Sequence, residues 1–410
     1  MSQAHSDKKR WRWLWITAIV VAILVVAAVA GWAIFVHDSR PDAPGAFYAA
    51  PSRLPDGPLG TIIRSEVIEG FHSGATAYRV LYKSTGYDGS PTAVSGFIVV
   101  PDDTPPAGGR KIIAYTHGTV GVASSCAPSL VTNQEQQPLL FEGGRELLEA
   151  GYVVAASDYQ GLGTPGPHPY LVGDSEAMNE LDIVRAAQNL TEAEAGTEFV
   201  VWGHSQGGHA SLFTGQLAAE YAPELQLVGV AAGAPVPNLV DLFKVNLETT
   251  VGKVLISMAL QSWARVYEDA SLDQIATPVA RPLIGRIAKN CLYTKRQILA
   301  SVPGSLALNL TFLHTPPWET EPWTTIVEKN NPGATRTNAP LLIIQGDADP
   351  IVTPDVTARL VDKLCAEGER VELRLLKGIG HLDAGHVAVP GVVQWIADRF
   401  AGKPAPTICT

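Results

Sequence analysis

The sequence predicts an α/β fold in which a mostly parallel, doubly wound sheet follows an antiparallel start. Short apolar runs, most of them continuous rather than alternating, are typical of strands buried on both faces; they lie at 111–116, 152–157, 199–202, 227–231, 341–345 and 371–375. Helical patterns separate many of them, at 143–150, 175–190, 355–366 and 392–400. Strands that alternate with helices favour parallel neighbours in one sheet.

Composition limits the class of protein and its partners. The chain has 410 residues, of which 46% are hydrophobic and 17% are charged, so it is globular rather than disordered. Its length suits one large domain with an insertion. The net charge of -10 argues against a nucleic-acid partner.

The N-terminus predicts the compartment. Residues 13–36 contain no Lys, Arg, Asp or Glu, and as a helix they would span about 36 Å, which exceeds the roughly 30 Å hydrocarbon core. The preceding tail, 1–12, is basic, so the positive-inside rule keeps it in the cytoplasm. We therefore expect a single-pass anchor in the cell membrane, with the globular part outside. The alternative is a signal peptide cleaved near residues 28–30, which would release a secreted protein.

The remaining chain divides into a linker, a core and an insertion. Residues 37–60 are rich in Pro, Gly and Ala and predict a linker. We assign the core to 61–236 and 339–410, starting with a run at 61–68 and a hairpin of 77–83 with 93–100. Residues 237–338 are too long for an ordinary crossover. We interpret them as a helical cap over the carboxyl ends of the strands, where ligands bind in such sheets; the alternative is a separate domain.

A Gly-x-Ser-x-Gly sequence, Gly203 to Gly207, stands between a predicted strand and a predicted helix. This context is typical of a nucleophile elbow, in which Ser205 would project from a sharp turn and glycines would relieve crowding. The alternative is a glycine-rich loop whose serine only caps the helix.

A serine nucleophile needs a base, here a histidine, and an acidic group that orients the histidine. In this fold the three follow one another along the chain in the order serine, acid, histidine. Asp349 follows the strand 341–345 and is the predicted acid, with Asp347 as the alternative. His381 follows the last strand on a glycine-rich loop and is the predicted base, with His386 as the alternative.

Backbone N–H groups should stabilise the oxyanion. We assign one to Gln206, directly after the serine, and the second to Thr119, with Gly118 or Val120 as alternatives. No metal ion or organic cofactor is expected.

These segments carry a resemblance to a known family. The chain resembles the secretory (yeast-type) lipases of the α/β-hydrolase superfamily at 116–119, 157–170, 203–207 and around Asp349 and His381. The resemblance implies an α/β-hydrolase core with a helical cap, and hydrolysis of carboxylic esters such as acylglycerols through an acyl-enzyme. It places Ser205, Asp349 and His381 on the catalytic triad. This chain departs from the family at two points. The yeast members have an acidic residue in the loop where this chain has Thr119, and they are freely secreted, whereas an anchor is expected here.

The chain has four cysteines, which allow three fully paired connectivities. The family resemblance implies that Cys126 pairs with Cys291, and the second bridge would join Cys365 to Cys409.

Other functions are compatible with the same residues. An acyltransferase would pass the acyl group to an alcohol instead of water, and a peptidase is possible on this core. A catalytically inactive binding protein with a hydrolase fold is the alternative from a different class. In the ester hydrolase, we expect Trp318, Trp323 and the apolar stretch near Met258 to bury the acyl chain, and the cap to gate access.

Overall fold

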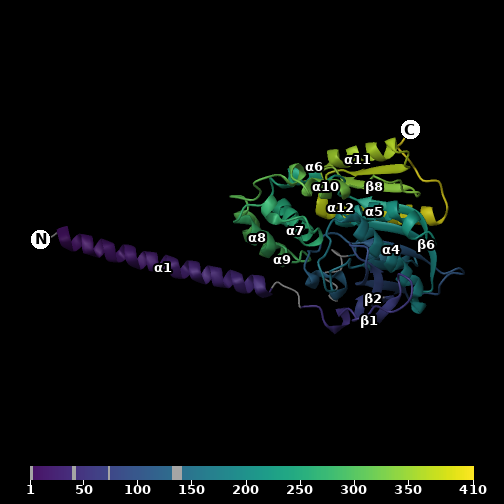
Figure 1. Ribbon diagram of the computed structural model, residues 1–410, viewed down its shortest axis with the longest axis horizontal. Coiled ribbons are helices and arrows are strands. Elements are labelled where there is room, and N and C mark those ends of the chain that lie inside the picture. Colours follow the sequence, from purple (N-terminus) through teal and green to yellow (C-terminus); the bar gives the residue numbers. More distant parts are fainter. Residues whose placement is uncertain (1–2, 39–42, 73, 132–140) are drawn as a thin grey trace. The chain divides into compact units, whose positions relative to one another are not determined.

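The computed structural model describes residues 3–38, 43–72, 74–131 and 141–410, which belong to two compact units. The N-terminal unit contains one long helix, α1 (Gln3–Asp38) (Figure 1). Across these described ranges, no helix combines the length and the hydropathy that crossing a bilayer requires. The prediction of a helix over 13–36 is therefore confirmed, whereas its prediction as a membrane span is not supported.

The second unit is built on one sheet. Its strands, within the described ranges, are β1 (Ile62–His72), β2 (Ala75–Thr85), β3 (Pro91–Pro101), β4 (Arg110–Thr116), β5 (Val153–Ser157), β6 (Ala195–His204), β7 (Gln226–Gly233), β8 (Leu341–Gly346) and β9 (Val371–Leu376). They lie in the order β1-β2-β3-β5-β4-β6-β7-β8-β9. β1, β2 and β3 are antiparallel, β3 is antiparallel to β5, and the pairs from β5 to β9 are parallel. The predicted antiparallel start and parallel main part are both confirmed.

Helices cover both faces of this sheet. They are α3 (Gly144–Glu149), α4 (Gly173–Asn189), α5 (Gln206–Tyr221), α11 (Pro354–Ala366) and α12 (His381–Phe400). Along β4, Ile112 and Ala114 pack in a cluster with α4 and α5, while Ile113 and Tyr115 pack in one with α3 and α12. Successive side chains of a strand point to opposite faces, so a strand covered on both sides must be apolar at every position. Each fully buried aliphatic side chain stabilises the fold by about 1.5–3 kcal/mol.

The insertion between β7 and β8 is helical. It contains α6 (Leu239–Asn246), α7 (Thr250–Val266), α8 (Ala280–Ile287), α9 (Lys295–Ala307) and α10 (Trp323–Lys329), which gather at one side of the sheet in Figure 1. Its buried side chains share one hydrophobic cluster with Tyr170, Leu171 and Val352 of the surrounding core. Residues 42–410 accordingly form one compact unit rather than a core with a separate domain.

One helix boundary differs from the sequence-based expectation. α12 begins at His381 instead of at 392, whereas His381 was expected on a glycine-rich loop. In the structure Gly380 is the N-cap and Pro390 lies inside the helix. The cost of an interior proline, about 3 kcal/mol, is opposed by the burial of Ala388, Val389 and Val392 around it.

Candidate active site

The sharp turn after β6 has the strained backbone that a nucleophile elbow requires. Ser205 has a φ of 61° and a ψ of -118°, a conformation that residues other than glycine rarely adopt. Its backbone N–H donates to the carbonyl oxygen of Gly233 at 2.8 Å. A Cβ atom on Gly203 or Gly207 would overlap Thr116 at the end of β4. The two glycines therefore let β6 and α5 meet closely enough to present the serine.

Three side chains that the sequence places far apart form a continuous hydrogen-bonded chain. His381 Nδ1 lies 2.7 Å from Asp349 Oδ2, and His381 Nε2 lies 2.8 Å from Ser205 Oγ. A carboxylate only accepts hydrogen bonds, so the ring proton lies on Nδ1 and the serine hydroxyl donates to Nε2. This is the arrangement that a general base needs in order to deprotonate a serine.

The acid is fixed by its own loop. Asp349 is buried, and its Oδ1 accepts hydrogen bonds from the backbone N–H groups of Ile351 at 2.8 Å and Val352 at 2.9 Å. Burial raises the pKa of Asp349, but the hydrogen bond and charge of His381, together with these two N–H groups, outweigh it and hold the pKa below its ordinary value. Burial, together with the charge of His204, lowers the pKa of His381 below its ordinary value despite the opposing effect of Asp349, so the imidazole is neutral at neutral pH.

The alternative acid and base lie elsewhere. Asp347 is exposed, and its carboxylate accepts the backbone N–H of Gly378 at 2.5 Å, which is the turn-capping role of a loop aspartate. His386 is exposed on α12. The structure brings Asp349 and His381 together with Ser205, and not these two residues.

The two residues expected to supply oxyanion N–H groups are Gln206, which follows the serine, and Thr119, which belongs to the loop after β4. Gln206 is the first residue of α5, and the N–H groups of a first helical turn have no partner within the helix. Its side chain donates to Glu176 Oε1 at 2.8 Å, and that buried carboxylate also binds His209 Nδ1 at 2.7 Å. Thr119 lines the same pocket as Ser205.

A second histidine and carboxylate lie beside the triad, and the sequence analysis did not identify them as a pair. His204 Nδ1 is 3.3 Å from Glu142 Oε1, and both side chains are more than nine-tenths buried. Burial lowers the pKa of His204, but the charges of Glu142 and Asp349 outweigh it, so the pKa lies above its ordinary value. A Cβ on Gly385 of α12 would overlap the Glu142 carboxylate in its present position, so the glycine leaves room for the pair.

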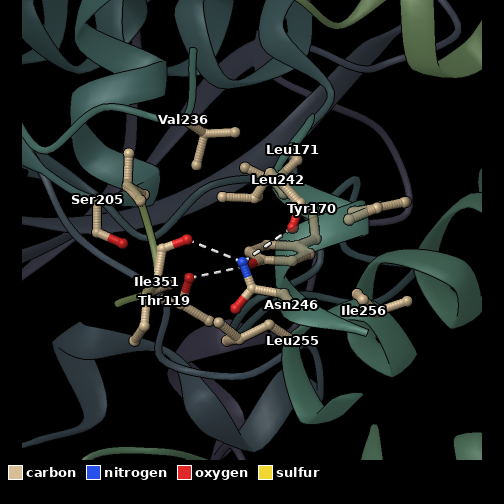
Figure 2. Close-up of a pocket in the computed structure, with 12 residues that line it drawn as sticks. Thr119, Tyr170, Leu171, Ser205, Val236, Leu242, Asn246, Leu255, Ile256 and Ile351 are labelled. Atoms are coloured by element: carbon tan, nitrogen blue, oxygen red, sulfur yellow. Dashed lines mark hydrogen bonds between the residues drawn. The ribbon is translucent and has the colours of Figure 1, made fainter. Parts of the chain in front are cut away.

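A narrow apolar pocket begins at the serine (Figure 2). The insertion supplies side chains from α6 and α7, and the loop after β8 supplies two more. The lining residues are Thr119, Tyr170, Leu171, Ser205, Val236, Leu242, Phe243, Asn246, Leu255, Ile256, Ile351 and Val352. The lining includes Leu255 and Ile256 from the stretch before Met258, but not the two predicted tryptophans. Trp323 is fully buried and Trp318 is partly buried in the insertion's own hydrophobic cluster, so their prediction as lining residues was wrong.

The segment 157–170 forms a scaffold around the site. Asp158 is buried and accepts from Ser95 Oγ at 2.6 Å and from the backbone N–H of Ser129 at 2.8 Å; burial, only partly offset by these bonds, raises its pKa to about 6. The ring of Tyr159 packs against the ring of His117 in a tilted arrangement, with the centroids 4.4 Å apart. His117 is thus a packed, buried residue of this scaffold. Only the end of the segment, Tyr170, reaches the pocket.

Both implied disulfides are present. Cys126–Cys291 joins the loop after β4 to the insertion, and Cys365–Cys409 joins α11 to the C-terminal tail. Next to the first bond, the Leu292 N–H donates to the carbonyl oxygen of Val120 at 2.9 Å. The loop that carries Thr119 is therefore attached covalently to the insertion that lines the pocket.

The chain is similar to several curated proteins that are named as lipases. A curated relative from Mycobacterium tuberculosis, named as a probable inactive lipase, is 26% identical over 380 residues, covering 87% of this chain and 82% of the relative. Lipase A of Arthroderma benhamiae is 25% identical over 390 residues, with 88% and 80% covered. Lipase 6 of Candida albicans is 25% identical over 407 residues, with 90% and 84% covered.

Solved structures share the fold. The crystal structure of Candida antarctica lipase A superposes with a TM-score of 0.76 at 20% identity, covering 89% of this chain and 87% of that chain. The rice cell wall degrading esterase LipA of Xanthomonas oryzae gives 0.64 at 19% identity, with 84% and 98% covered. These likenesses establish the α/β-hydrolase fold.

Membership of a family follows from the match to a family model, which covers more than half of the chain. The sequence model of the secretory lipases matches residues 131–407, which include Ser205, Asp349, His381 and the whole insertion. The chain belongs to the secretory lipase family and is an ester hydrolase of the lipase and esterase type.

Proposed function

We propose that this protein hydrolyses carboxylic esters, with acylglycerols or shorter esters as substrates, through an acyl-enzyme on Ser205. The observation that carries the proposal is the position of His381, within 2.8 Å of Ser205 Oγ and 2.7 Å of Asp349 Oδ2. Ser205 attacks the ester carbonyl while His381 Nε2 accepts its proton, and Asp349 stabilises the imidazolium that forms.

The first half-reaction ends with loss of the alcohol. The N–H groups of Gln206 and Thr119 are assigned to the tetrahedral oxyanion, and each such donor lowers the barrier by roughly 3–4 kcal/mol. His381 returns the proton to the leaving alkoxide, so the alcohol departs neutral. Water then attacks the acyl-enzyme with His381 again as the base, and the carboxylic acid is released.

The pocket supports an acyl chain as the buried part of the substrate. It begins at Ser205, and its lining between α6, α7 and the loop after β8 is mainly aliphatic. An aliphatic chain gains about 0.8 kcal/mol for each methylene that it buries. The insertion supplies much of this lining, so it is suited to gate entry of the acyl chain.

The test is hydrolysis of p-nitrophenyl esters from acetate to palmitate by the full-length chain in mild detergent, beside Ser205→Ala. We expect activity in the parent and a loss of roughly 10⁴-fold or more in the variant. One relative is named as a probable inactive lipase, so a folded parent without activity would favour a binding protein. Adding an acceptor alcohol and analysing the products separates hydrolysis from acyl transfer.

An extracytoplasmic location is supported by the secretory family and by two disulfides, which persist in oxidising compartments. Anchoring through residues 13–36 remains a separate hypothesis, motivated by their lack of charged side chains. Cell fractionation with an antibody to the C-terminus tests it. Full-length protein that resists extraction with alkaline carbonate would support an anchor, whereas a shortened protein in the medium would support cleavage.

A further inference from the structure

The apolar pocket contains one amide side chain. Asn246, the last residue of α6, is only 2% exposed and lines the pocket that begins at Ser205. The side chains next to it in the lining include Leu242, Phe243 and Leu255. A leucine has nearly the same shape as an asparagine and would fill this position without removing a polar group from water.

The orientation of the amide follows from its partners. Asn246 Nδ2 donates to the carbonyl oxygens of Leu242 at 2.9 Å and Ile351 at 2.8 Å. Both partners only accept hydrogen bonds, so the nitrogen must face them and the oxygen must face away. In Figure 2 the amide oxygen points to the side where Leu255 is drawn. Among the described residues, Asn246 Oδ1 is buried and has no hydrogen-bond partner.

This acceptor is held rigidly with respect to the triad. The backbone carbonyl oxygen of Asn246 accepts the N–H of Thr249 at 3.1 Å, and a Cβ on Gly252 would overlap the Asn246 backbone. Ile351 accepts from the Asn246 amide, and its own N–H donates to Asp349. These contacts fix the Asn246 side chain in the wall of the pocket that begins at Ser205.

A buried acceptor without a partner is unfavourable, because it has lost its hydrogen bonds to water and gained none in return. A plain alkyl chain in the pocket would leave Oδ1 unpaired, whereas a chain with a hydroxyl group at the right carbon would pair with it. None of the described lining residues carries a charge, so a neutral donor fits better than an ammonium group.

We propose that Asn246 selects esters whose acyl chain carries a hydroxyl group, which donates to Asn246 Oδ1 inside the pocket. This inference rests on the proposed ester hydrolysis and specifies its substrate class. The competing explanation is that Asn246 only holds α6 in place against the loop of Asp349 through its two N–H donors. Loss of such a structural role would change kcat/KM for all esters alike, whereas loss of an acceptor would change the ratio of kcat/KM between hydroxylated and plain esters.

The experiment compares methyl octanoate with methyl esters of octanoate hydroxylated at C3, C6, C7 or C8, and with the matching methoxy compounds. Acid release is followed by titration at constant pH. We expect kcat/KM for one hydroxylated isomer to exceed that for methyl octanoate by roughly 5- to 30-fold. The methoxy compound at the same carbon should show no gain, because it has an oxygen but no donor.

Asn246→Leu should reduce the preference for the hydroxylated isomer to about twofold or less. Val236→Ala is the matched control, because it enlarges the same pocket on a side away from the amide oxygen and leaves the acceptor in place, so the preference should persist. If Asn246→Leu does not fold, Asn246→Gln replaces it. Its oxygen stands one methylene further out, and the preferred hydroxyl position should move along the chain.

The outcomes separate the two proposals. Ser205-dependent hydrolysis without a preference above twofold at any position would overturn the role of Asn246 and leave the esterase proposal intact. A preference that survives unchanged in Asn246→Leu, or that stays at the same carbon in Asn246→Gln, would also overturn that role. Absence of hydrolysis for every ester, including the p-nitrophenyl series, would overturn both.

Discussion

The centroids of the imidazole rings of His204 and His381 lie 4.9 Å apart, and the ring planes make an angle of 39°. His204 is paired with buried Glu142, which favours its charged form, while His381 is the proposed base and must be neutral to act. A positive charge beside His381 disfavours protonation of its ring. His204, which precedes Ser205, therefore keeps His381 neutral, and able to act as the base, down to a lower pH.

His204→Gln should move the acid limb of the pH profile of kcat/KM to higher pH. The pKa of His381 is below its ordinary value, first through burial and then through the charge of His204, so its neutral form persists as the pH falls. The variant loses the positive charge of His204 and keeps the negative charge of Glu142, and both effects raise the pKa of His381. As the pH falls, activity should therefore be lost at a higher pH than in the parent.

Steady-state kinetics between pH 4 and pH 9 check this prediction. His386→Gln is the control, because His386 is an exposed histidine on the same helix as His381. Its acid limb should coincide with that of the parent. An unchanged limb in His204→Gln would mean that His204 does not act on the base electrostatically.

Asp349→Asn should lower kcat by roughly 10³- to 10⁴-fold, because an amide cannot stabilise the imidazolium or hold the ring in the required tautomer. Asp347→Asn should change kcat by no more than a few-fold, since Asp347 is exposed and only accepts from Gly378. The comparison uses the same p-nitrophenyl ester and confirms folding of both variants by circular dichroism. A larger loss in Asp347→Asn would reverse the assignment of the acid.

The sequence could predict the triad because a parallel sheet brings distant residues to one edge. Ser205 follows β6, Asp349 lies just beyond β8 and His381 lies just beyond β9. The carboxyl ends of parallel strands lie at the same edge, so three polar residues after three apolar runs must come near one another. The strand pattern therefore located the edge of the sheet where the site lies, and the Gly-x-Ser-x-Gly motif identified the nucleophile there.

Other features depend on tertiary packing that no local pattern records. Glu142 lies in a loop before α3, and its partner His204 is in β6, so neither periodicity nor spacing connects them. The early start of α12 was missed because Pro390 opposes a helix locally, while burial against the sheet favours it. Asn246 is one polar residue at the end of an amphipathic helix, and only the contacts of its amide distinguish it from a surface residue.

Removal of the Cys126–Cys291 bond should destabilise the protein more than removal of the Cys365–Cys409 bond. The first closes a separation of 165 residues and the second one of 44. With the chain-entropy relation, these loops correspond to about 5 and about 4 kcal/mol at 25 °C, so the difference is about 1 kcal/mol.

Paired serine substitutions, followed by thermal unfolding and ester hydrolysis, check this order. The first variant should also lose activity, because the bond ties the Thr119 loop to the insertion, whereas the second should retain it. Equal melting temperatures with equal activity would show that the insertion keeps its place without the covalent link.

Gly207→Ala should abolish activity, and it should do so through the backbone. The new Cβ would overlap the carbonyl oxygen of Thr116, so α5 or β4 would have to move, and both support the strained backbone of Ser205. Misplacing reacting atoms by about 1 Å can cost on the order of 10²-fold in rate, and we expect at least that loss in kcat.

Gly285→Ala on α8 is the control, because the nearest atom to its Cβ would be the flexible Gln261 side chain at 3.2 Å. That variant should keep parental kcat and gain up to about 1 kcal/mol from helix propensity. A fully active Gly207→Ala protein would mean that the elbow tolerates a side chain where the geometry leaves no room for one.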